Sequence, residues 1–311
     1  MSWADARPCA VRVPATSANL GPGFDSFGLA LGLYDVVTAR VLPEGLAIEV
    51  SGTGADTAGA GEQHLVIRAM RTAFARLGGQ PPGLAIACAN QIPQGFGLGS
   101  SAGAIVAGLL AARALAGPEG QAALTDDDVL HLATRMEGHP DNVAACLAGG
   151  LTIAWAPAAA TPDGPAARVA RLTPLPGIGA VLCLPATPVL TSAARAVLPP
   201  EVPHAAAAAN SARAALLVAA LTSRSELLMD ATEDFLHQRY RAAAMPATAT
   251  LIDALRAAGI PAVVSGAGPS VLAFVQDGAG PKPGDVTAIA GPDWQVQLLP
   301  IDTQGATVQP A

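Results

Sequence analysis

The chain has 311 residues and a net charge of −7 at pH 7, and 51% of its residues are hydrophobic, many of them alanine. This length accommodates two ordinary domains with an interior of small aliphatic side chains. The negative charge disfavours nucleic acid or an anionic membrane as the main partner, although local arginines can still bind a small anion.

The cysteines at positions 9, 88, 146 and 183 are widely spaced and form no C-x-x-C pair. This pattern argues against a zinc site or a disulfide framework and favours reduced thiols. The N-terminus has no apolar signal core, and no run approaches the roughly 20 apolar residues that cross a bilayer. We therefore expect a soluble, cytoplasmic protein that binds neither a membrane nor a nucleic acid.

The first predicted strand, at residues 10–14, leads into the sequence ATSANLGPGFDSFGLAL. The Gly-Pro-Gly at residues 21–23 forces a turn between Asn19 and Asp25. The Asp25 carboxylate either caps this turn or lines a pocket, where it would need a cationic partner. The residues by themselves leave both roles open.

Alternating apolar residues predict strands at 36–41, 46–50 and 84–88. Before the last of these, apolar residues at helical spacing predict a helix over residues 62–77 that stops at a Gly-Gly pair. We expect His64, near the start of this helix, to be a surface residue.

The next stretch, residues 92–115, reads IPQGFGLGSSAGAIVAGLLAARAL. Its last 14 residues have the length and Ala/Leu content of a buried helix. A glycine loop before a helix N-terminus is an anion site, because free N–H groups and the helix dipole point at the ligand. Ser100 and Ser101 at the helix start favour a phosphate over the alternative, a glycine-rich turn before a core helix.

Two better-known phosphate loops are absent from this stretch. Its G-x-G-x-G spacing differs from the G-x-G-x-x-G of dinucleotide-binding folds. A Walker loop needs a lysine, and the only lysine is Lys282, far along the chain. We expect a phosphate here to be neutralised by backbone dipoles, arginines and a metal ion.

Thr125 is predicted to cap a helix that has three aspartates, residues 126–128, in its first turn. Glu137 falls in the last turn, where its charge faces the negative end of the helix dipole. This unfavourable electrostatic interaction indicates a functional use for Glu137, although an exposed glutamate at a helix end is also common.

Pro/Ala-rich residues 156–174 indicate a linker, so we predict domains at 1–158 and 159–311. The segments expected in the second domain are a strand at 179–184, helices at 205–221, around 226–241 and at 247–258, a strand–loop–strand unit at 262–275, and after 276 a Gly/Pro turn, one strand and a disordered tail.

Pro93 and the run from Gly97 to Ala102 (GLGSSA) resemble the central motif of the GHMP kinases, with Gly103 where the family usually has a second alanine. The stretch 13–31, GHPDNV with the following Gly149-Gly150, and the glycine loop 266–270 also resemble family motifs. These motifs follow the family's order between about residue 10 and residue 275. The resemblance is closest to the branch of the family that phosphorylates L-homoserine.

This resemblance implies roles for individual residues. Glu137 and Ser101 would bind Mg²⁺, and Glu137, His139 and Asn142 would lie at the reaction centre. In several sister kinases an aspartate is the general base, whereas this branch has an asparagine at position 142. The family's adenine pocket includes an asparagine that corresponds to His64. The ATP-binding residues would be Pro93, Gly95, Gly97, Leu98, Gly99, Ser100, Ser101 and Ala102.

The same resemblance implies a substrate site. Asn19 and Asp25 would hold the ammonium group of homoserine, and Arg195 and Arg241 would grip its carboxylate. The remaining substrate-binding residues would be Thr191 and His139.

The fold implied is α+β with two domains, the N-terminal one similar to the second domain of ribosomal protein S5 and the C-terminal one ferredoxin-like. The active site would lie between them, with ATP and Mg²⁺ as cofactors and O-phospho-L-homoserine as the product. Family members are often dimeric, which makes a homodimer the expected assembly. Two alternatives remain: another GHMP small-molecule kinase, and a GHMP-fold binding protein without catalysis.

Overall fold

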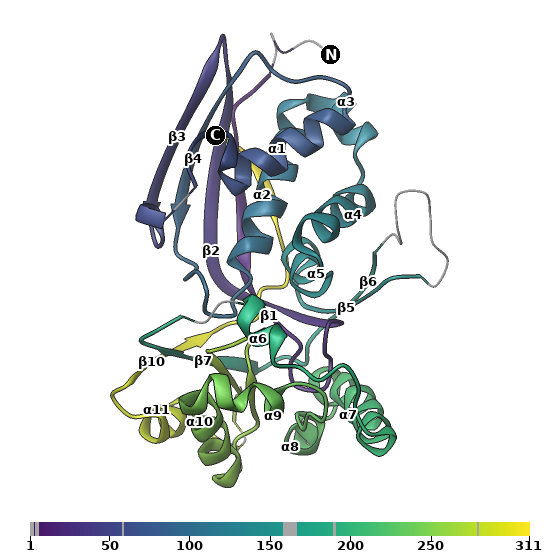
Figure 1. The fold of residues 1–311 in the computed structure, drawn as a ribbon, viewed down its shortest axis with the longest axis vertical. Helices are drawn as coiled ribbons and strands as arrows, with labels where there is room; N and C mark the ends of the chain where they lie inside the picture. The colour runs from purple at the N-terminus through teal and green to yellow at the C-terminus, as the bar shows by residue number, and fades with distance from the viewer. Residues whose placement is uncertain (1–2, 4–5, 58, 158–166, 189–190, 279) are drawn as a thin grey trace.

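Two β-sheets, one in each half of the molecule, organise the fold (Figure 1). The computed structural model describes residues 3, 6–57, 59–157, 167–188, 191–278 and 280–311. The two halves lie one above the other along the longest axis, and the chain passes between them more than once.

The first sheet has seven strands in the described residues, in the order β11-β1-β2-β4-β3, and β5 pairs with β2 and β6. Neighbouring strands are antiparallel except β3 and β4, which are parallel. The strands are β1 (Cys9–Ala18), β2 (Phe27–Leu42), β3 (Gly45–Gly52), β4 (Gly83–Asn90), β5 (Leu151–Trp155), β6 (Arg168–Leu172) and β11 (Thr307–Pro310).

Helices cover one face of the first sheet (Figure 1). Apolar side chains such as Val13 of β1, Phe74 and Leu109 form one buried core between helices and sheet. The helix predicted after the glycine loop is confirmed, and it is buried around most of its circumference because it is apolar on every side. The helices are α1 (Leu65–Arg76), α2 (Ser100–Leu115), α3 (Gly117–Ala123), α4 (Asp126–Glu137) and α5 (Asp141–Ala148), with short 3₁₀ turns at Ala55–Thr57 and Gly61–Gln63.

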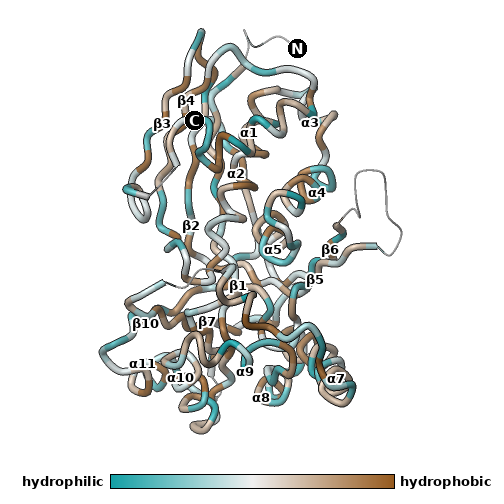
Figure 2. The backbone as a smooth tube through the Cα atoms, viewed as in Figure 1, coloured by the Kyte–Doolittle hydropathy of each residue, from teal (hydrophilic) through white to brown (hydrophobic). Residues whose placement is uncertain are grey.

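The second sheet is antiparallel, in the order β10-β7-β9-β8. Side chains of β7 alternate between its faces: Leu182 packs toward α7, and Val181 and Cys183 pack toward α10 and α11. Figure 2 shows apolar residues along these strands. The elements are β7 (Ile178–Pro185), β8 (Ala262–Val264), β9 (Val271–Gln276), β10 (Trp294–Leu299), α6 (Thr191–Ala196), α7 (His204–Thr222), α8 (Leu228–Ala231), α9 (Gln238–Arg241), α10 (Pro246–Ala257) and α11 (Pro283–Ala290), with 3₁₀ turns at Ser225–Leu227 and Ala242–Ala244.

The helical stretch predicted around residues 226–241 is interrupted between α8 and α9. Asp234 is the physical reason. Its carboxylate accepts hydrogen bonds from the backbone N–H groups of Leu236, His237 and Gln238, at 3.0, 2.9 and 2.7 Å. These local bonds compete with a continuous helical ladder and start a new short helix at Gln238.

The prediction of a disordered C-terminal tail is wrong. Residues Thr307–Pro310 form β11, which pairs with β1 from Cys9↔Pro310 to Arg12↔Thr307. The tail therefore satisfies backbone groups of β1 that a sheet edge would leave unpaired. The boundary predicted between residues 158 and 159 lies outside the described residues and stays a prediction, although β6 and β11, both beyond it, belong to the first sheet.

Among the described residues, α7 is the one helix that is long and apolar enough to cross a membrane by length and composition, whereas we expected no such run. Its alanines account for this property. Asn210 of α7 donates to the Pro22 carbonyl, Arg213 pairs with Glu233, and Leu217 lies in the core. These contacts join α7 to the turn between β1 and β2 and to the rest of the second half.

Candidate active site

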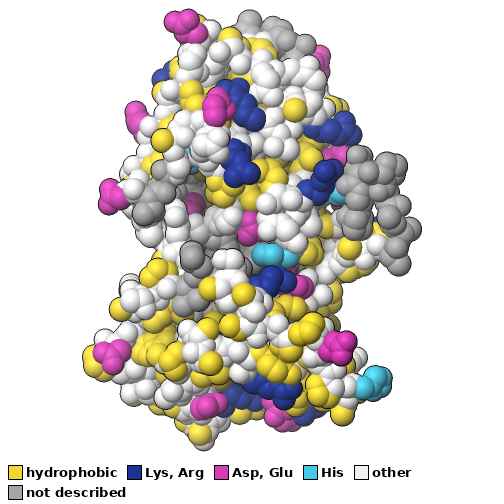
Figure 3. Space-filling model, in the orientation of Figure 1, with side chains coloured by type: hydrophobic (Ala, Val, Ile, Leu, Met, Phe, Trp, Pro, Cys, Tyr) yellow, Lys and Arg dark blue, Asp and Glu magenta, His cyan; other side chains and the backbone are white. Residues whose placement is uncertain are grey.

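A cavity of about 290 Å³ lies between the two halves. Figure 3 shows an indented waist there, at which acidic, basic and histidine side chains gather. The predicted residues that line the cavity are Asn19, Asp25, Pro93, Gly95, Gly97, Leu98, Gly99, Ser100, Ser101, Glu137, His139, Asn142, Arg195 and Arg241.

Of the predicted site residues whose side chains the structure describes, Ala102 does not line the cavity. Ala102 is part of the first turn of α2 and is fully buried in the core of the first half. Thr191 begins α6, and its side chain lies outside the part of the chain that the structure describes.

The glycine loop takes a conformation that requires glycine. Gly95, Gly97 and Gly99 have φ of +80°, +71° and +68°, and Gly99 immediately precedes α2. A Cβ on Gly97 would lie 2.1 Å from the Ser265 carbonyl oxygen, and one on Gly99 would lie 1.9 Å from Thr16 Oγ1. A side chain at either position would therefore collide with the protein itself.

The first turn of α2 faces the end of α4 across the cavity. Ser101 Oγ donates a hydrogen bond of 2.7 Å to Glu137 Oε2. The N–H groups in the first turn of a helix have no intrahelical partner, so this end of α2 offers donors to an anion. A hydroxyl and a carboxylate beside those donors combine an anion site with two oxygen ligands for a cation.

His139 and Asn142 are held by Asp141, a residue to which the sequence reasoning gave no role. The buried Asp141 Oδ1 accepts from His139 Nδ1 at 2.8 Å and from the Asn142 backbone N–H at 2.7 Å. The hydrogen bond to Asp141 raises the pKa of His139 above its ordinary value. The only sequence signal for Asp141 was its place within the GHPDN run, residues 138–142.

The Asn142 side chain is oriented by Thr16, which sequence reasoning also missed. Thr16 Oγ1 donates to Asn142 Oδ1 at 2.7 Å, and Thr16, a residue of β1, is fully buried. The contact spans 126 residues of chain, so no local pattern could have indicated it. This hydrogen bond occupies the amide oxygen of Asn142, and the Asn142 side chain carries no charge.

The turn between β1 and β2 holds Asn19 and Asp25 in unusual backbone conformations. Asn19, Leu20 and Asp25 have φ of +68°, +50° and +55°. Positive φ is costly for Leu20, and such strain persists where the surroundings enforce it, commonly at functional sites. Asn19 enforces it here: its Oδ1 accepts from Asp25 N–H at 2.9 Å, and its Nδ2 donates to the Gly266 carbonyl at 2.8 Å.

Both predicted arginines reach the cavity from the second half. Arg195 pairs with Asp25 through two hydrogen bonds, of 3.0 and 2.7 Å. This contact raises the pKa of Arg195. Arg241 is 2% exposed, and both guanidinium carbons lie 5.6 Å from the centre of the Phe24 ring. Phe24, in the turn that carries Asp25, is therefore close to both cations.

His64 is not a surface residue, contrary to our expectation. It precedes α1, as predicted for a helix start, but it is 7% exposed and lines the cavity. Its Nδ1 is buried without a hydrogen-bond partner among the described residues, and burial lowers its pKa. Asp35 lies in the same wall, where it accepts from the backbone N–H groups of Gln91 and Ile92.

Comparison with known proteins places these features in a family. A model described as the GHMP kinases N terminal domain matches residues 64–150, and one described as GHMP kinases C terminal matches residues 212–283. The chain is 56% identical to a homoserine kinase of Streptomyces coelicolor, over 96% of this chain and 94% of that one. It is 47% identical to a homoserine kinase of Leifsonia xyli, over 97% and 92%.

A solved structure gives the same correspondence in three dimensions. The crystal structure of homoserine kinase from Cytophaga hutchinsonii superposes with a TM-score of 0.81 at 26% identity, and 98% of each chain is covered. The two sheets, the glycine loop and the waist between the halves are thus parts of a fold that this relative shares.

Proposed function

The chain belongs to the GHMP kinase family, and we propose that it is a homoserine kinase, which transfers the γ-phosphoryl group of ATP to the hydroxyl of L-homoserine. One observation carries the proposal. An acid, Asp25, and two arginines, Arg195 and Arg241, meet in one cavity beside the glycine loop that precedes α2. A zwitterionic acceptor beside a phosphate site matches this distribution of charge.

The ATP site would be formed by the glycine loop and the start of α2. The chain's only lysine is Lys282, which does not line the cavity, so the phosphates would be held mainly by backbone N–H groups. Donors fixed in the fold need little reorganisation as charge moves during phosphoryl transfer. His64 supports an adenine contact near α1, because its buried Nδ1 has no partner among the described residues.

The residues near Ser101 fit a magnesium ion. Mg²⁺ favours oxygen ligands and is commonly held by one or two carboxylates together with substrate phosphates and water. Ser101 Oγ and Glu137 Oε2 supply such oxygens 2.7 Å apart, and the described residues contain no group of three or more metal-ligating side chains. We assign Ser101 and Glu137 as the ligands. When bound, the ion would neutralise charge on the phosphates.

The acceptor would lie between Asp25 and the arginines. Asn19 and Asp25 would hold the ammonium group, and the planar guanidinium groups would bind the carboxylate, a geometry that lysine does not offer. Nη2 of Arg241 makes no hydrogen bond to the described residues, so its two N–H groups are available to the substrate. The substrate would then bridge the two halves.

The reaction forms a bond between the homoserine hydroxyl oxygen and the γ-phosphorus, breaks the bond from that phosphorus to the bridging oxygen of ADP, and releases the hydroxyl proton. His139 and Asn142 would orient the hydroxyl, because Asp141 and Thr16 hold their side chains in place. Asn142 is neutral and its amide oxygen is occupied. We therefore assign no dedicated carboxylate base, and the catalysis would come mainly from positioning and charge neutralisation.

The expected cytoplasmic location and homodimeric assembly belong to the same proposal. The free, buried thiols of Cys9, Cys88, Cys146 and Cys183 support a reducing compartment. Size-exclusion chromatography with light scattering would measure the assembly directly.

The test is an ADP-release assay with a panel of hydroxylated acceptors: L-homoserine, L-serine, L-threonine, mevalonate and galactose. We expect L-homoserine to give the highest kcat/KM. Preferential phosphorylation of mevalonate or galactose would replace this assignment with another GHMP kinase activity. Absence of turnover with every acceptor would favour the non-catalytic alternative.

A further inference from the structure

His237 is a fully buried side chain that connects Arg241 to the turn before Asp25. Its Nδ1 lies 3.0 Å from Arg241 Nη1, and its Nε2 lies 2.8 Å from the Gly21 carbonyl oxygen. A guanidinium can only donate, and a carbonyl can only accept. The two partners therefore fix the ring as the neutral tautomer with its hydrogen on Nε2.

The contact to His237 is part of a set of bonds that aims the Arg241 guanidinium. Nε donates to the Ala194 carbonyl at 3.1 Å, and Nη1 also reaches the Gly266 carbonyl at 3.3 Å. Among the described residues, Nη2 has no acceptor, and the side chain lines the cavity. The protein thus bonds to Nε and Nη1 of the guanidinium and leaves Nη2 for a ligand.

The other nitrogen of His237 holds the turn that carries Asn19 and Asp25. The neighbouring carbonyl, that of Pro22, accepts from Asn210 Nδ2 at 2.8 Å. Asn19 Nδ2 donates to the Gly266 carbonyl, the same oxygen that Arg241 approaches. The candidate ammonium and carboxylate sites are therefore joined through His237 on one path and through Gly266 on another.

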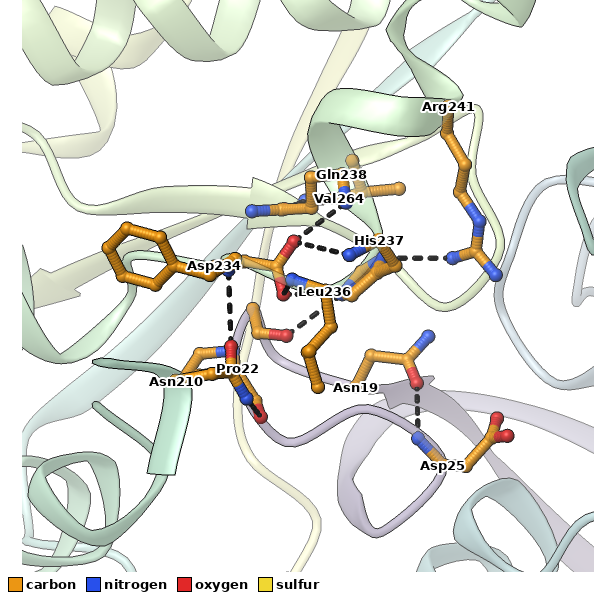
Figure 4. Close-up of polar contacts among 12 residues, drawn as sticks. Asn19, Pro22, Asp25, Asn210, Asp234, Leu236, His237, Gln238, Arg241 and Val264 are labelled. Carbon is orange, nitrogen blue, oxygen red and sulfur yellow. Dashed lines mark hydrogen bonds and ion pairs between the residues drawn. The ribbon is translucent and has the colours of Figure 1, made fainter. Parts of the chain in front are cut away.

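His237 is itself held rigidly from behind. Figure 4 shows the ring between the Asp234 carboxylate and the Arg241 guanidinium. Asp234 has no exposed side-chain surface and accepts the His237 backbone N–H, and the ring stacks on Phe24 with centroids 5.2 Å apart. Because these contacts fix the ring, the position of the turn at Gly21 determines where the ring holds the Arg241 guanidinium.

We propose that His237 is a positioning residue for the substrate, which sets the spacing between Arg241 and the Asn19–Asp25 turn and hence between the carboxylate and ammonium sites. It does not touch the substrate and acts only as the neutral ring. This inference rests on the proposed function, because it assigns a substrate zwitterion to those two sites.

Three substitutions of His237 distinguish the effect of its hydrogen bond to Arg241 from the effect of its hydrogen bond to Gly21. His237→Asn keeps an acceptor near the Nδ1 position for Arg241, and His237→Gln keeps a donor near the Nε2 position for Gly21. His237→Phe removes both bonds and keeps an aromatic ring against Phe24. We expect His237→Phe to raise the KM for homoserine by roughly tenfold to a hundredfold. The Asn and Gln variants should show smaller increases, with kcat and the KM for ATP unchanged in all three.

Asp302→Asn is the matched control for lost stability. Asp302 is 5% exposed, accepts the backbone N–H groups of Gln304 and Gly305, and is not among the residues that line the cavity. This variant should lower the thermal unfolding temperature without changing the KM for homoserine. If Asp302→Asn raised the KM for homoserine as much as His237→Phe does, general destabilisation would explain both increases. That result would overturn the proposal.

A spectroscopic measurement tests the ring without any substrate. ¹⁵N NMR of histidine-labelled protein should show one imidazole with an unprotonated Nδ1 and a protonated Nε2, absent from His237→Gln. A doubly protonated ring at neutral pH would overturn the inference even if His237→Phe does not fold. Wild-type protein that does not phosphorylate homoserine would overturn the proposed function, whereas an unaltered homoserine KM in active His237→Phe would overturn only the positioning role.

Discussion

Asp25 and Arg195 form an ion pair across the cavity, with two hydrogen bonds between residues that are 170 positions apart in the chain. The side chains are 35% and 44% exposed, and pairs this open contribute at most about 1 kcal/mol. The same two residues are proposed to bind the ammonium and carboxylate groups of the substrate. A zwitterion can therefore exchange with the pair at little cost, while a ligand with one charge would leave one partner unpaired.

Homoserine methyl ester should be a much poorer substrate than homoserine. The neutral ester leaves Arg195 and Arg241 without a carboxylate, and a lost charge-assisted hydrogen bond costs about 1.5–3 kcal/mol, or roughly a tenfold to hundredfold fall in kcat/KM. Steady-state kinetics with both compounds measure this gap, and Arg195→Ala should narrow it. Equal efficiency for acid and ester in the wild type would contradict the carboxylate clamp.

Asp25→Asn should raise the KM for homoserine strongly, beyond any loss in kcat. The substitution removes the charge that is proposed to hold the ammonium group, and it also frees Arg195. The KM for ATP serves as the internal control and should not change. A fall in kcat alone, with homoserine binding intact, would instead identify Asp25 as a general base.

Glu137→Gln should remove most of the activity while the protein stays folded, because one ligand charge is lost and the side-chain volume is kept. Asp127→Asn is the control, since Asp127 lies exposed on the same helix outside the cavity. Circular dichroism checks the fold, and ADP release across a magnesium titration checks the activity. Near-normal turnover of Glu137→Gln at ordinary Mg²⁺ would falsify the metal assignment.

Gly99→Ala and Gly103→Ala should have opposite effects on the free energy of unfolding. An added Cβ at Gly99 meets Thr16 Oγ1 at 1.9 Å on a backbone with φ of +68°, whereas one at Gly103 meets only Val13 Cγ2 at 3.5 Å. Alanine in a helix interior is favoured over glycine by about 0.5–1 kcal/mol. Urea denaturation should therefore show Gly99→Ala less stable and Gly103→Ala as stable as the wild type or more so.

His139 and His237 should make opposite contributions to the pH dependence of stability. The hydrogen bond to Asp141 raises the pKa of His139 above 6.5, so its contribution is present below pH 6.5 and is lost as the pH rises through the native pKa. Burial lowers the pKa of His237 below 6.5, so the unfolded chain binds the extra proton and stability falls as the pH drops below 6.5.

The charged groups that face His237 are Asp234, Arg241 and Asp25, and they add smaller effects of both signs to its burial. Denaturation at a series of pH values should show the stability difference between wild type and His139→Gln shrinking as the pH rises. The difference between wild type and His237→Gln should grow over the same change. If both stability differences rose with pH, or both fell, the result would contradict these pKa directions.

Features that depend on neighbouring residues could be predicted from the sequence. The glycine loop before α2 and the capping box of Thr125 with Asp128 are written in a few consecutive positions, because turns and helix ends are stabilised by contacts within one or two turns. The family motifs were recognisable for the same reason, since each is a short continuous run. The fold class was implied by the resemblance to the family that these motifs carry.

Which distant side chains meet could not be predicted from the sequence, because it depends on how the elements pack. The packing of α5 against β1 brings Asn142 to Thr16, and the packing of the second half against the turn between β1 and β2 brings His237 to Gly21. Local propensity contains no term for such distant contacts, since their free energy exists only after the elements have packed. The break at Asp234 is different, because its carboxylate accepts backbone N–H groups only two to four residues ahead, a local contact that apolar periodicity does not record.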